Sequence, residues 1–353
     1  DQRTAHPDPD ADWDRSNGRV YRIQASGAKP AAHFDLNELT SDQLVDRLSD
    51  TNDWYVQRAR RLLAERRDAS VLPRLQALAQ QSGDDRLALQ ALWALYVSGG
   101  WDDAVAARML GHRSPAVRYW TVRFLGDRRQ VSADIGNRLL ELARGEPSAV
   151  VRSQLAASAK RLPADDALAL VWQLTQRNED LEDPFIPLLL WWAVEAKADR
   201  HRPQILARFA SPDGWQRPLV RDVILTRLMQ RCAMEASGDS LADCGRLLKS
   251  APAGVDRNLM LASLDEGLGG KRLSAPPAEL REALAVLGDP AQASDPHLLR
   301  LAVACGSPAA EQRIRQLIAD PQVPTATRVT LVQSLGQMGD ASCVPHLLGR
   351  LLI

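Results

Sequence analysis

One recurring helical stripe constrains the fold of this chain more than any other feature. Six segments carry mostly apolar residues at positions i, i+4 and i+8, which places them on one face of a helix. The stripes are Tyr55/Ala59/Leu63, Leu87/Ala91/Leu95, Val117/Thr121/Leu125, Val151/Leu155/Ala159, Val220/Ile224/Leu228 and Thr327/Leu331/Leu335. The early copies recur after about 30–34 residues, with helix-breaking Gly, Pro, Asp or Ser between them. A period of this length with two helices per unit predicts an α-solenoid.

The chain divides into a short arm and a long helical region. The helix pattern begins at about residue 40, where Thr40 and Gln43 have the spacing of a capping box. We predict an all-α superhelix of about nine helix pairs over residues 40–353. Residues 1–38 differ, because Gly18–Ile23 alternates polar residues with β-formers and predicts one strand. A lone strand is not stable, so we expect an irregular arm that is the remnant of a preceding domain.

Charge and hydropathy argue against two kinds of protein. The chain has 44 Lys+Arg and 44 Asp+Glu, a net charge of zero, which disfavours a nucleic-acid-binding role. The longest apolar run, Phe185–Val194, contains Pro187 and is far shorter than the roughly 20 residues of a membrane span. We therefore expect no membrane span and no nucleic-acid partner in this chain, and we expect a monomer.

An arginine follows the first stripe position in four of the six copies. These residues are Arg118, Arg152, Arg221 and Arg328. The Val-Arg pairs at the start of the second helix resemble HEAT repeats. That resemblance implies that the arginines form a structural ladder between neighbouring units and do not bind a ligand.

Three stretches together resemble one family. They are W-D-R-S-N-G-R-V-Y-R-I at 13–23, W-Y-V-Q-R-A-R-R-L-L-A-E-R at 54–66 and D-P-F-I-P-L-L-L-W-W-A-V-E at 183–195. They are similar to the PVC-type haem-binding proteins of planctomycetes and relatives, large exported chains often described as membrane-bound dehydrogenases. The order in that family is a quinoprotein-like β-propeller, a HEAT-repeat segment and a cytochrome c domain.

The resemblance implies that this chain is the middle of such a protein. Residues 12–23 would be the last propeller strand, and residues 40–353 the HEAT repeats. The implied role is a non-catalytic, extracytoplasmic scaffold that spaces the propeller and the cytochrome c domain of the same parent chain. The chain has no C-x-x-C-H motif, so it carries no covalent haem of its own. We accordingly assign no catalytic, cofactor-binding or metal-binding residue.

Tryptophan is unusually frequent: it accounts for 9 of the aromatic residues, against 4 Tyr and 4 Phe. Trp93, Trp120 and Trp172 lie on helical stripes and are expected in the core. Trp191 and Trp192 are adjacent, so they do not both face inward on one helix. We predict that one of them, together with Glu195, contacts a partner, while the alternative is that both pack inside the solenoid.

Two of the four cysteines are candidates for a disulfide bond. Cys232 precedes and Cys244 follows a predicted turn at Ser237-Gly238-Asp239, so they lie near the same height of a helical hairpin. A disulfide is compatible with an exported protein. The alternative is that both cysteines simply fill the core. We expect no bond between Cys305 and Cys343.

Metal and phosphate motifs are incomplete. The acidic run Asp8, Asp10, Asp12 and Asp14 lacks the Gly and Glu of a calcium loop, so we expect a solvated acidic linker. Residues 267–271 read G-L-G-G-K but lack the remaining residues of a P-loop, and they predict a helix end and turn. No H-E-x-x-H motif occurs.

Two other functions are compatible with a HEAT-like fold. One is an alkylpurine DNA glycosylase, in which Trp191, Trp192, Glu195 and the arginine-rich segment 58–67 would face damaged DNA. The neutral charge disfavours that reading, because the phosphate contacts would lack a basic field. The other is a free-standing interaction module in the cytoplasm. A continuous basic stripe along the concave face would favour the glycosylase.

Overall fold

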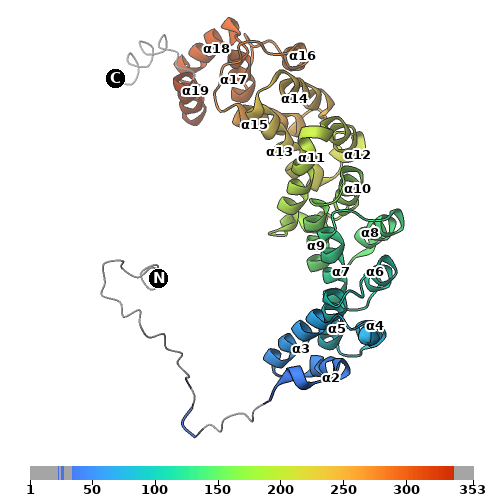
Figure 1. Ribbon diagram of the computed structural model, residues 1–353. Coiled ribbons are helices and arrows are strands. Elements are labelled where there is room, and N and C mark those ends of the chain that lie inside the picture. Colours follow the sequence, from blue (N-terminus) through green and yellow to red (C-terminus); the bar gives the residue numbers. More distant parts are fainter. Residues whose placement is uncertain (1–22, 24, 28–33, 338–353) are drawn as a thin grey trace, which may run out of the picture.

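The chain forms a curved stack of antiparallel helix pairs (Figure 1). The computed structural model describes residue 23, residues 25–27 and residues 34–337. Within these residues there is no β-strand, and α2–α19 form nine consecutive pairs. The predicted all-α superhelix is therefore confirmed. The predicted strand lies outside the described residues except for Ile23, which belongs to no regular element.

The first helices of the pairs lie on the convex side of the arc and the second helices on the concave side (Figure 1). The outer helices are α2 (Ser41–Asp46), α4 (Leu72–Gln81), α6 (Asp103–Leu110), α8 (Ala133–Gly145), α10 (Ala164–Leu174), α12 (Pro212–Trp215), α14 (Gly238–Ser250), α16 (Ala278–Ala285) and α18 (Pro308–Ala319). The inner helices are α3 (Asp53–Arg66), α5 (Asp85–Val97), α7 (Pro115–Asp127), α9 (Ala149–Ala159), α11 (Ile186–Phe209), α13 (Thr226–Glu235), α15 (Val255–Leu268), α17 (Pro296–Ala304) and α19 (Thr325–Gln337).

The sequence signals that start and stop helices act as expected. The Thr40 hydroxyl accepts from the Gln43 backbone N–H at 3.2 Å, and the Gln43 side chain accepts from the Thr40 N–H at 2.8 Å. This is the predicted capping box of α2. Gly269 ends α15 in the left-handed region at φ 56°, so the predicted helix end and turn there are also confirmed.

The predicted stripes form the core. The second and third positions of all six stripes are buried, because this face of each inner helix packs against its outer partner and its neighbours. The buried side chains form one large cluster in the middle of the stack and a smaller cluster at each end. Each cluster spans several pairs, as expected for units that do not bury their apolar faces alone.

The sequence predicts that four arginines connect successive units, and two of them do so through buried ion pairs. Arg118 donates to Glu146 at 2.7 and 2.6 Å, and Arg152 donates to Asp180 at 2.7 and 2.5 Å. The bond to Asp180 raises the pKa of Arg152. Arg221 instead pairs mainly with its neighbour Asp222, and reaches Asp256 of the next unit at 3.5 Å. Arg328 donates to Thr325 in its own helix, and the residues that follow α19 lie outside the described residues.

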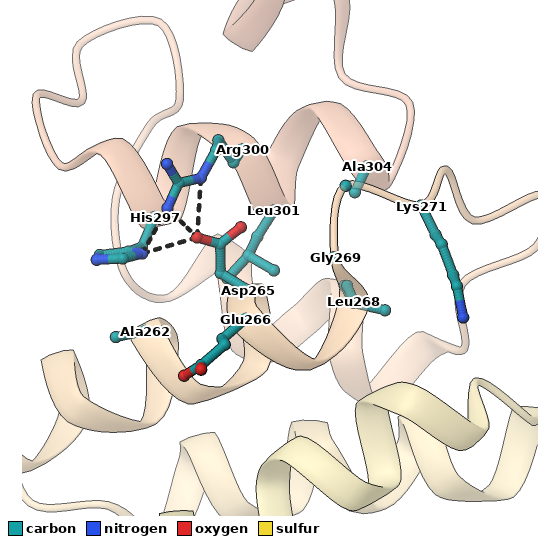
Figure 2. Close-up of a pocket in the computed structure, with 11 residues that line it drawn as sticks. Ala262, Asp265, Glu266, Leu268, Gly269, Lys271, His297, Arg300, Leu301 and Ala304 are labelled. Atoms are coloured by element: carbon teal, nitrogen blue, oxygen red, sulfur yellow. Dashed lines mark hydrogen bonds and ion pairs between the residues drawn. The ribbon is translucent and has the colours of Figure 1, made fainter. Parts of the chain in front are cut away.

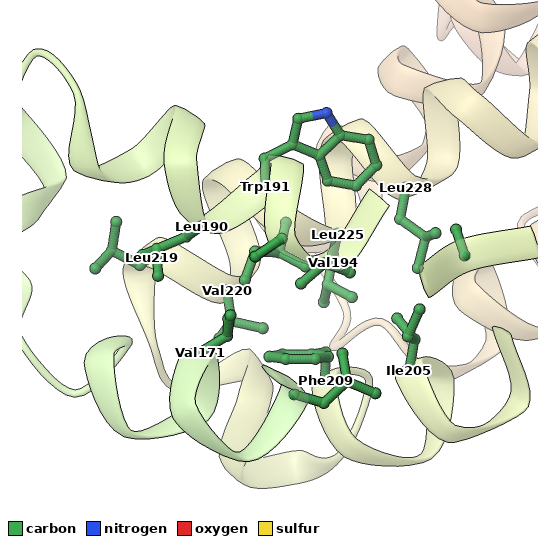
Figure 3. Packing of buried hydrophobic residues seen from close by; sticks show 14 of the residues in the cluster. Val171, Leu190, Trp191, Val194, Ile205, Phe209, Leu219, Val220, Leu225 and Leu228 are labelled. Carbon is green, nitrogen blue, oxygen red and sulfur yellow. The ribbon is translucent and has the colours of Figure 1, made fainter. Parts of the chain in front are cut away.

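Helix α11 has an interruption that the sequence pattern did not predict. His201 has non-helical dihedrals, φ −125° and ψ 22°, and Pro203 follows it. Proline removes a backbone donor and clashes with the preceding turn, which explains a kink at this point. The part after the kink returns to the core, where Ile205 and Phe209 are fully buried (Figure 3).

Candidate interaction surface

The tryptophan pair on α11 splits between two environments. Trp191 is 6% exposed and packs near Leu225 and Leu228 (Figure 3), whereas Trp192 is 40% exposed. The Lys160 ammonium lies 5.7 Å from the Trp192 ring centroid. Successive helical residues point about 100° apart, so only one of two neighbours faces the core. The structure therefore brings Trp191 and Glu195 together, one turn apart, and separates Trp192 from both.

Trp191 and Glu195 line a hollow of about 530 Å³ between α11 and α13. We call it the α11–α13 hollow. Arg231 crosses it and pairs with Glu195 at 3.5 Å and with Asp199. Met234, which is 65% exposed, lies at its edge. The full lining is Trp191, Glu195, Asp199, Arg227, Gln230, Arg231, Met234 and Glu235. An apolar surface flanked by charges of both signs is suited to bind an apolar side chain of a partner protein together with the polar residues around it.

A second surface covers α3, α5 and α7, and we call it the aromatic–arginine patch. It comprises Trp54, Arg58, Arg60, Trp93, Trp120 and Arg123. Trp54 is 61% exposed, and it lines a hollow of about 410 Å³ together with Arg58 and Arg60.

The patch is joined across its three helices by ring contacts. The Arg60 guanidinium lies 5.0 Å from the Trp93 ring, Trp93 meets Trp120 edge-on at 5.0 Å, and Arg123 lies 5.1 Å from Trp120. Burial lowers the pKa of Arg60, which also donates to Gln90 at 2.6 Å. Cations over aromatic faces gain electrostatic attraction and leave both groups accessible at a surface.

These contacts correct an expectation about the core. Trp93, Trp120 and Trp172 are only partly buried, and they pack against the core clusters without being enclosed by them. Each places one ring face under a guanidinium, with Arg217 lying 3.5 Å from the Trp172 ring. The indole is amphipathic and is well suited to such a partly exposed position. The high share of tryptophan was the only sequence signal for the patch.

The patch carries an excess of positive charge. Helices α3, α5 and α7 contain seven arginines and four carboxylates. All four carboxylates are paired, in Arg86–Asp53, Arg61–Glu65, Arg113–Asp85 and Arg161–Asp127. Arg58, Arg60 and Arg123 have no carboxylate partner among the described residues. The α11–α13 hollow has the opposite balance, because its lining holds three carboxylates and two arginines.

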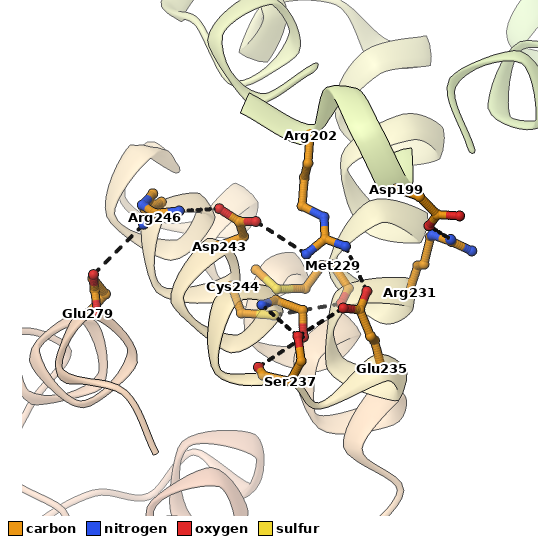
Figure 4. A network of polar contacts seen from close by, with 11 residues as sticks. Asp199, Arg202, Met229, Arg231, Glu235, Ser237, Asp243, Cys244, Arg246 and Glu279 are labelled. Atoms are coloured by element: carbon orange, nitrogen blue, oxygen red, sulfur yellow. Dashed lines mark hydrogen bonds and ion pairs between the residues drawn. The ribbon is translucent and has the colours of Figure 1, made fainter. Parts of the chain in front are cut away.

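The candidate disulfide is not formed in the structure. Cys232 and Cys244 are free, buried thiols on α13 and α14. The interaction with the Cys232 thiol, together with burial, raises the pKa of Cys244. The Cys244 thiol also faces the Met229 carbonyl at 3.9 Å, within a polar network in which Arg202 donates to Glu235 at 2.7 Å (Figure 4). Cys305 is also a free thiol, and Cys343 lies outside the described residues.

A third hollow, of about 450 Å³, lies between α15 and α17 (Figure 2). His297 Nδ1 lies 2.8 Å from Asp265 Oδ2, and Arg300 donates to the same oxygen, through Nε at 2.8 Å. No Ser, Thr or Cys is among the residues that line this hollow, so the Asp–His pair lacks the hydroxyl or thiol of a catalytic triad there. The contacts join two successive inner helices.

The described residues contain no group of three or more His, Cys, Asp or Glu side chains placed to hold a metal ion. Among the helices described here, none is long and apolar enough to cross a bilayer. A comparison with protein-family models finds no match for this chain, and neither does a comparison with curated proteins. The class of protein that the fold defines is an all-helical α-solenoid.

Proposed function

We propose that the chain is a non-catalytic interaction scaffold whose concave face binds protein domains. The observation that carries the proposal is the continuous inner face of α3–α17, with two separate surfaces of different chemistry on it. The aromatic–arginine patch is basic, and the α11–α13 hollow is mixed in charge with apolar Trp191 and Met234. Solenoids offer such extended concave faces for binding, and exposed Trp, Met and Arg are enriched in interfaces.

The partners in this proposal follow from the resemblance given above. They are a quinoprotein-like propeller and a cytochrome c domain of one exported, extracytoplasmic, oxidoreductase-like parent chain. Two distinct surfaces on one face fit a scaffold that holds two different domains. Carboxylates outnumber arginines in the lining of the α11–α13 hollow, so a phosphate backbone that followed the arc would meet negative charge there. We therefore favour protein domains over DNA as partners.

The test begins with the native gene, which should encode a propeller and a C-x-x-C-H domain in frame with this chain. Each domain is then purified, and its binding to the chain is measured by calorimetry. The Met234→Asp variant places a charge at the edge of the α11–α13 hollow, and we expect it to weaken binding of one domain by about tenfold or more. The matched control is Val286→Asp, at a strongly exposed position just after outer helix α16.

Val286→Asp should leave the dissociation constant unchanged. A gene that encodes neither domain would remove the proposed partners. Equal loss of binding in both variants would show that the inner face is not the docking surface.

A further inference from the structure

The middle turns of α3, α5 and α7 carry positive charge and no negative charge. Asp and Glu occur only at the first residue or the last two residues of these helices, and all four are paired with arginines. Between these ends lie Arg58, Arg60 and Arg123, which have no carboxylate partner among the described residues. A carboxylate that reaches this part of the solenoid therefore meets three guanidinium groups and no repelling charge from the same helices.

Two of these arginines are already ordered by contacts with indole rings. The Arg60 guanidinium lies 5.0 Å from the Trp93 ring centroid. The Arg123 guanidinium lies 5.1 Å from the Trp120 ring centroid. Among the described residues Arg123 gives none of its N–H donors to another group, and Arg60 gives only one, to Gln90 at 2.6 Å. A side chain that is ordered before binding loses less conformational entropy when it binds, so the contacts favour affinity for an anion.

The distance between Arg60 and Arg123 fits the side-chain spacing of an extended peptide. The rings of Trp93 and Trp120 are 5.0 Å apart, so three successive steps of about 5 Å join the two guanidinium groups. The two groups are therefore no more than about 15 Å apart. In an extended segment every second side chain points to the same side, so carboxylates at positions i and i+4 are about 13 Å apart. A segment with an acidic residue at every second position can thus reach both arginines.

We propose that the aromatic–arginine patch binds an extended acidic segment of a partner protein, whose carboxylates pair with Arg58, Arg60 and Arg123. Charge-assisted bonds between arginine and carboxylate are strong, and the planar guanidinium makes them directional. The proposal rests on the proposed function and deepens it, because it names the chemistry by which the solenoid recognises one of its partner domains.

The patch is less suited to a single-stranded nucleic acid. Strand binding combines base stacking on aromatic faces with a basic groove that follows the backbone. Trp93 and Trp120 are only partly buried, but each has a guanidinium over its ring, so Trp54 is the most accessible ring of the patch. A strand that continued along the inner face to the α11–α13 hollow would meet more carboxylates than arginines there.

The experiment measures the binding of a fluorescein-labelled dodecapeptide of six Glu-Ser repeats to the full chain by fluorescence anisotropy. This peptide carries a carboxylate at every second position and no aromatic or apolar side chain. We expect saturable binding at low salt that weakens as salt is added, because exposed charge pairs are screened. The uncharged dodecapeptide of six Gln-Ser repeats should not bind.

The double variant Arg58→Gln, Arg123→Gln should raise the dissociation constant of the Glu-Ser peptide at least fivefold. The matched control, Arg108→Gln, Arg144→Gln, removes the same charge from exposed positions on outer helices α6 and α8 and should leave the constant unchanged. Thermal unfolding curves report whether each variant is folded. A second measurement needs no variant: in the original chain, the bound peptide should protect Arg58 and Arg123, but not Arg108 or Arg144, from modification by phenylglyoxal.

The proposal would be overturned if the Glu-Ser peptide did not bind, if both double variants weakened binding equally, or if the peptide protected other arginines in place of those of the patch. Tighter binding of a twelve-nucleotide oligothymidine than of the peptide would also overturn it. Calorimetry with the encoded domains is a separate readout. If a domain binds and the peptide does not, the proposed function stands without this recognition. If the peptide binds the patch and neither domain binds, the patch stands and the proposed partners are wrong.

Discussion

The buried ion pair between Arg152 and Asp180 allows a sharp test of how the repeats are joined. Arg152 makes two bonds to the Asp180 carboxylate and two to the carbonyl oxygens of Glu146 and Pro147, at 3.1 and 2.9 Å. The Asp180 side chain is 2% exposed. Arg152→Ala leaves that carboxylate buried without its partner, and such losses cost about 3–5 kcal/mol. We expect the free energy of unfolding to fall by that amount in urea titrations.

A double-mutant cycle separates the pair from other losses. Asp180→Ala alone is also expected to be strongly destabilising, because it leaves the guanidinium buried. The double variant should be less destabilised than the sum of the single variants by about 2 kcal/mol. Arg128→Ala is the control, since its pair with Asp103 is exposed and worth about 0–1 kcal/mol. If Arg152→Ala costs no more than Arg128→Ala, the ladder does not join the units as argued.

Three further predictions follow from particular residues. Gly267→Ala should cost about 1–3 kcal/mol in urea titrations, because a Cβ there would lie 2.6 Å from Ala233 Cβ of α13; Gly145→Ala, where a Cβ meets no atom within 4 Å, should be neutral or stabilising, and equal effects would contradict the close approach of the helices. Burial lowers the pKa of His112 below its ordinary value of 6.5, so the unfolded chain binds the proton more readily and stability should fall as the pH drops from about 7 through the lowered pKa. His112→Asn should flatten that part of the pH profile, and an unchanged profile would contradict the assignment. Because the Cys232 and Cys244 thiols are both buried and interact with each other, mild oxidation of the folded chain should yield a Cys232–Cys244 linked peptide in non-reducing maps. Linkage only after unfolding would show that the thiols are not adjacent.

The helical stack could be predicted from the sequence because its signals are local and periodic. The i, i+4, i+8 stripes specify which face of each helix is buried, and Leu63, Leu95 and Leu125 are each about 1% exposed as the pattern requires. The capping box at Thr40 was equally local. Arg118 and Arg152 were correctly placed as links between units, through the resemblance of their Val-Arg pairs to HEAT repeats.

The two candidate binding surfaces were harder to predict from the sequence, because they depend on contacts between helices about 30 residues apart. Trp93 and Trp120 follow the stripe pattern, yet they are only partly buried, and each ring lies under an arginine from another turn or helix. Charge pairing is hidden for the same reason, since a net charge of zero conceals the local arginine excess on α3, α5 and α7. The kink at His201 was missed because Pro203 follows an otherwise uninterrupted helix pattern.

Hydrogen exchange with and without the adjoining domain tests the central claim most directly. The measurement uses the full chain and each domain encoded next to it in the native gene. We predict slowed exchange in the inner helices, first of all α3, α5 and α7 or α11 and α13, with outer helices α4, α6 and α8 unchanged. Slowed exchange confined to the outer helices, or no change with either domain at saturating concentration, would contradict a scaffold that binds through its concave face.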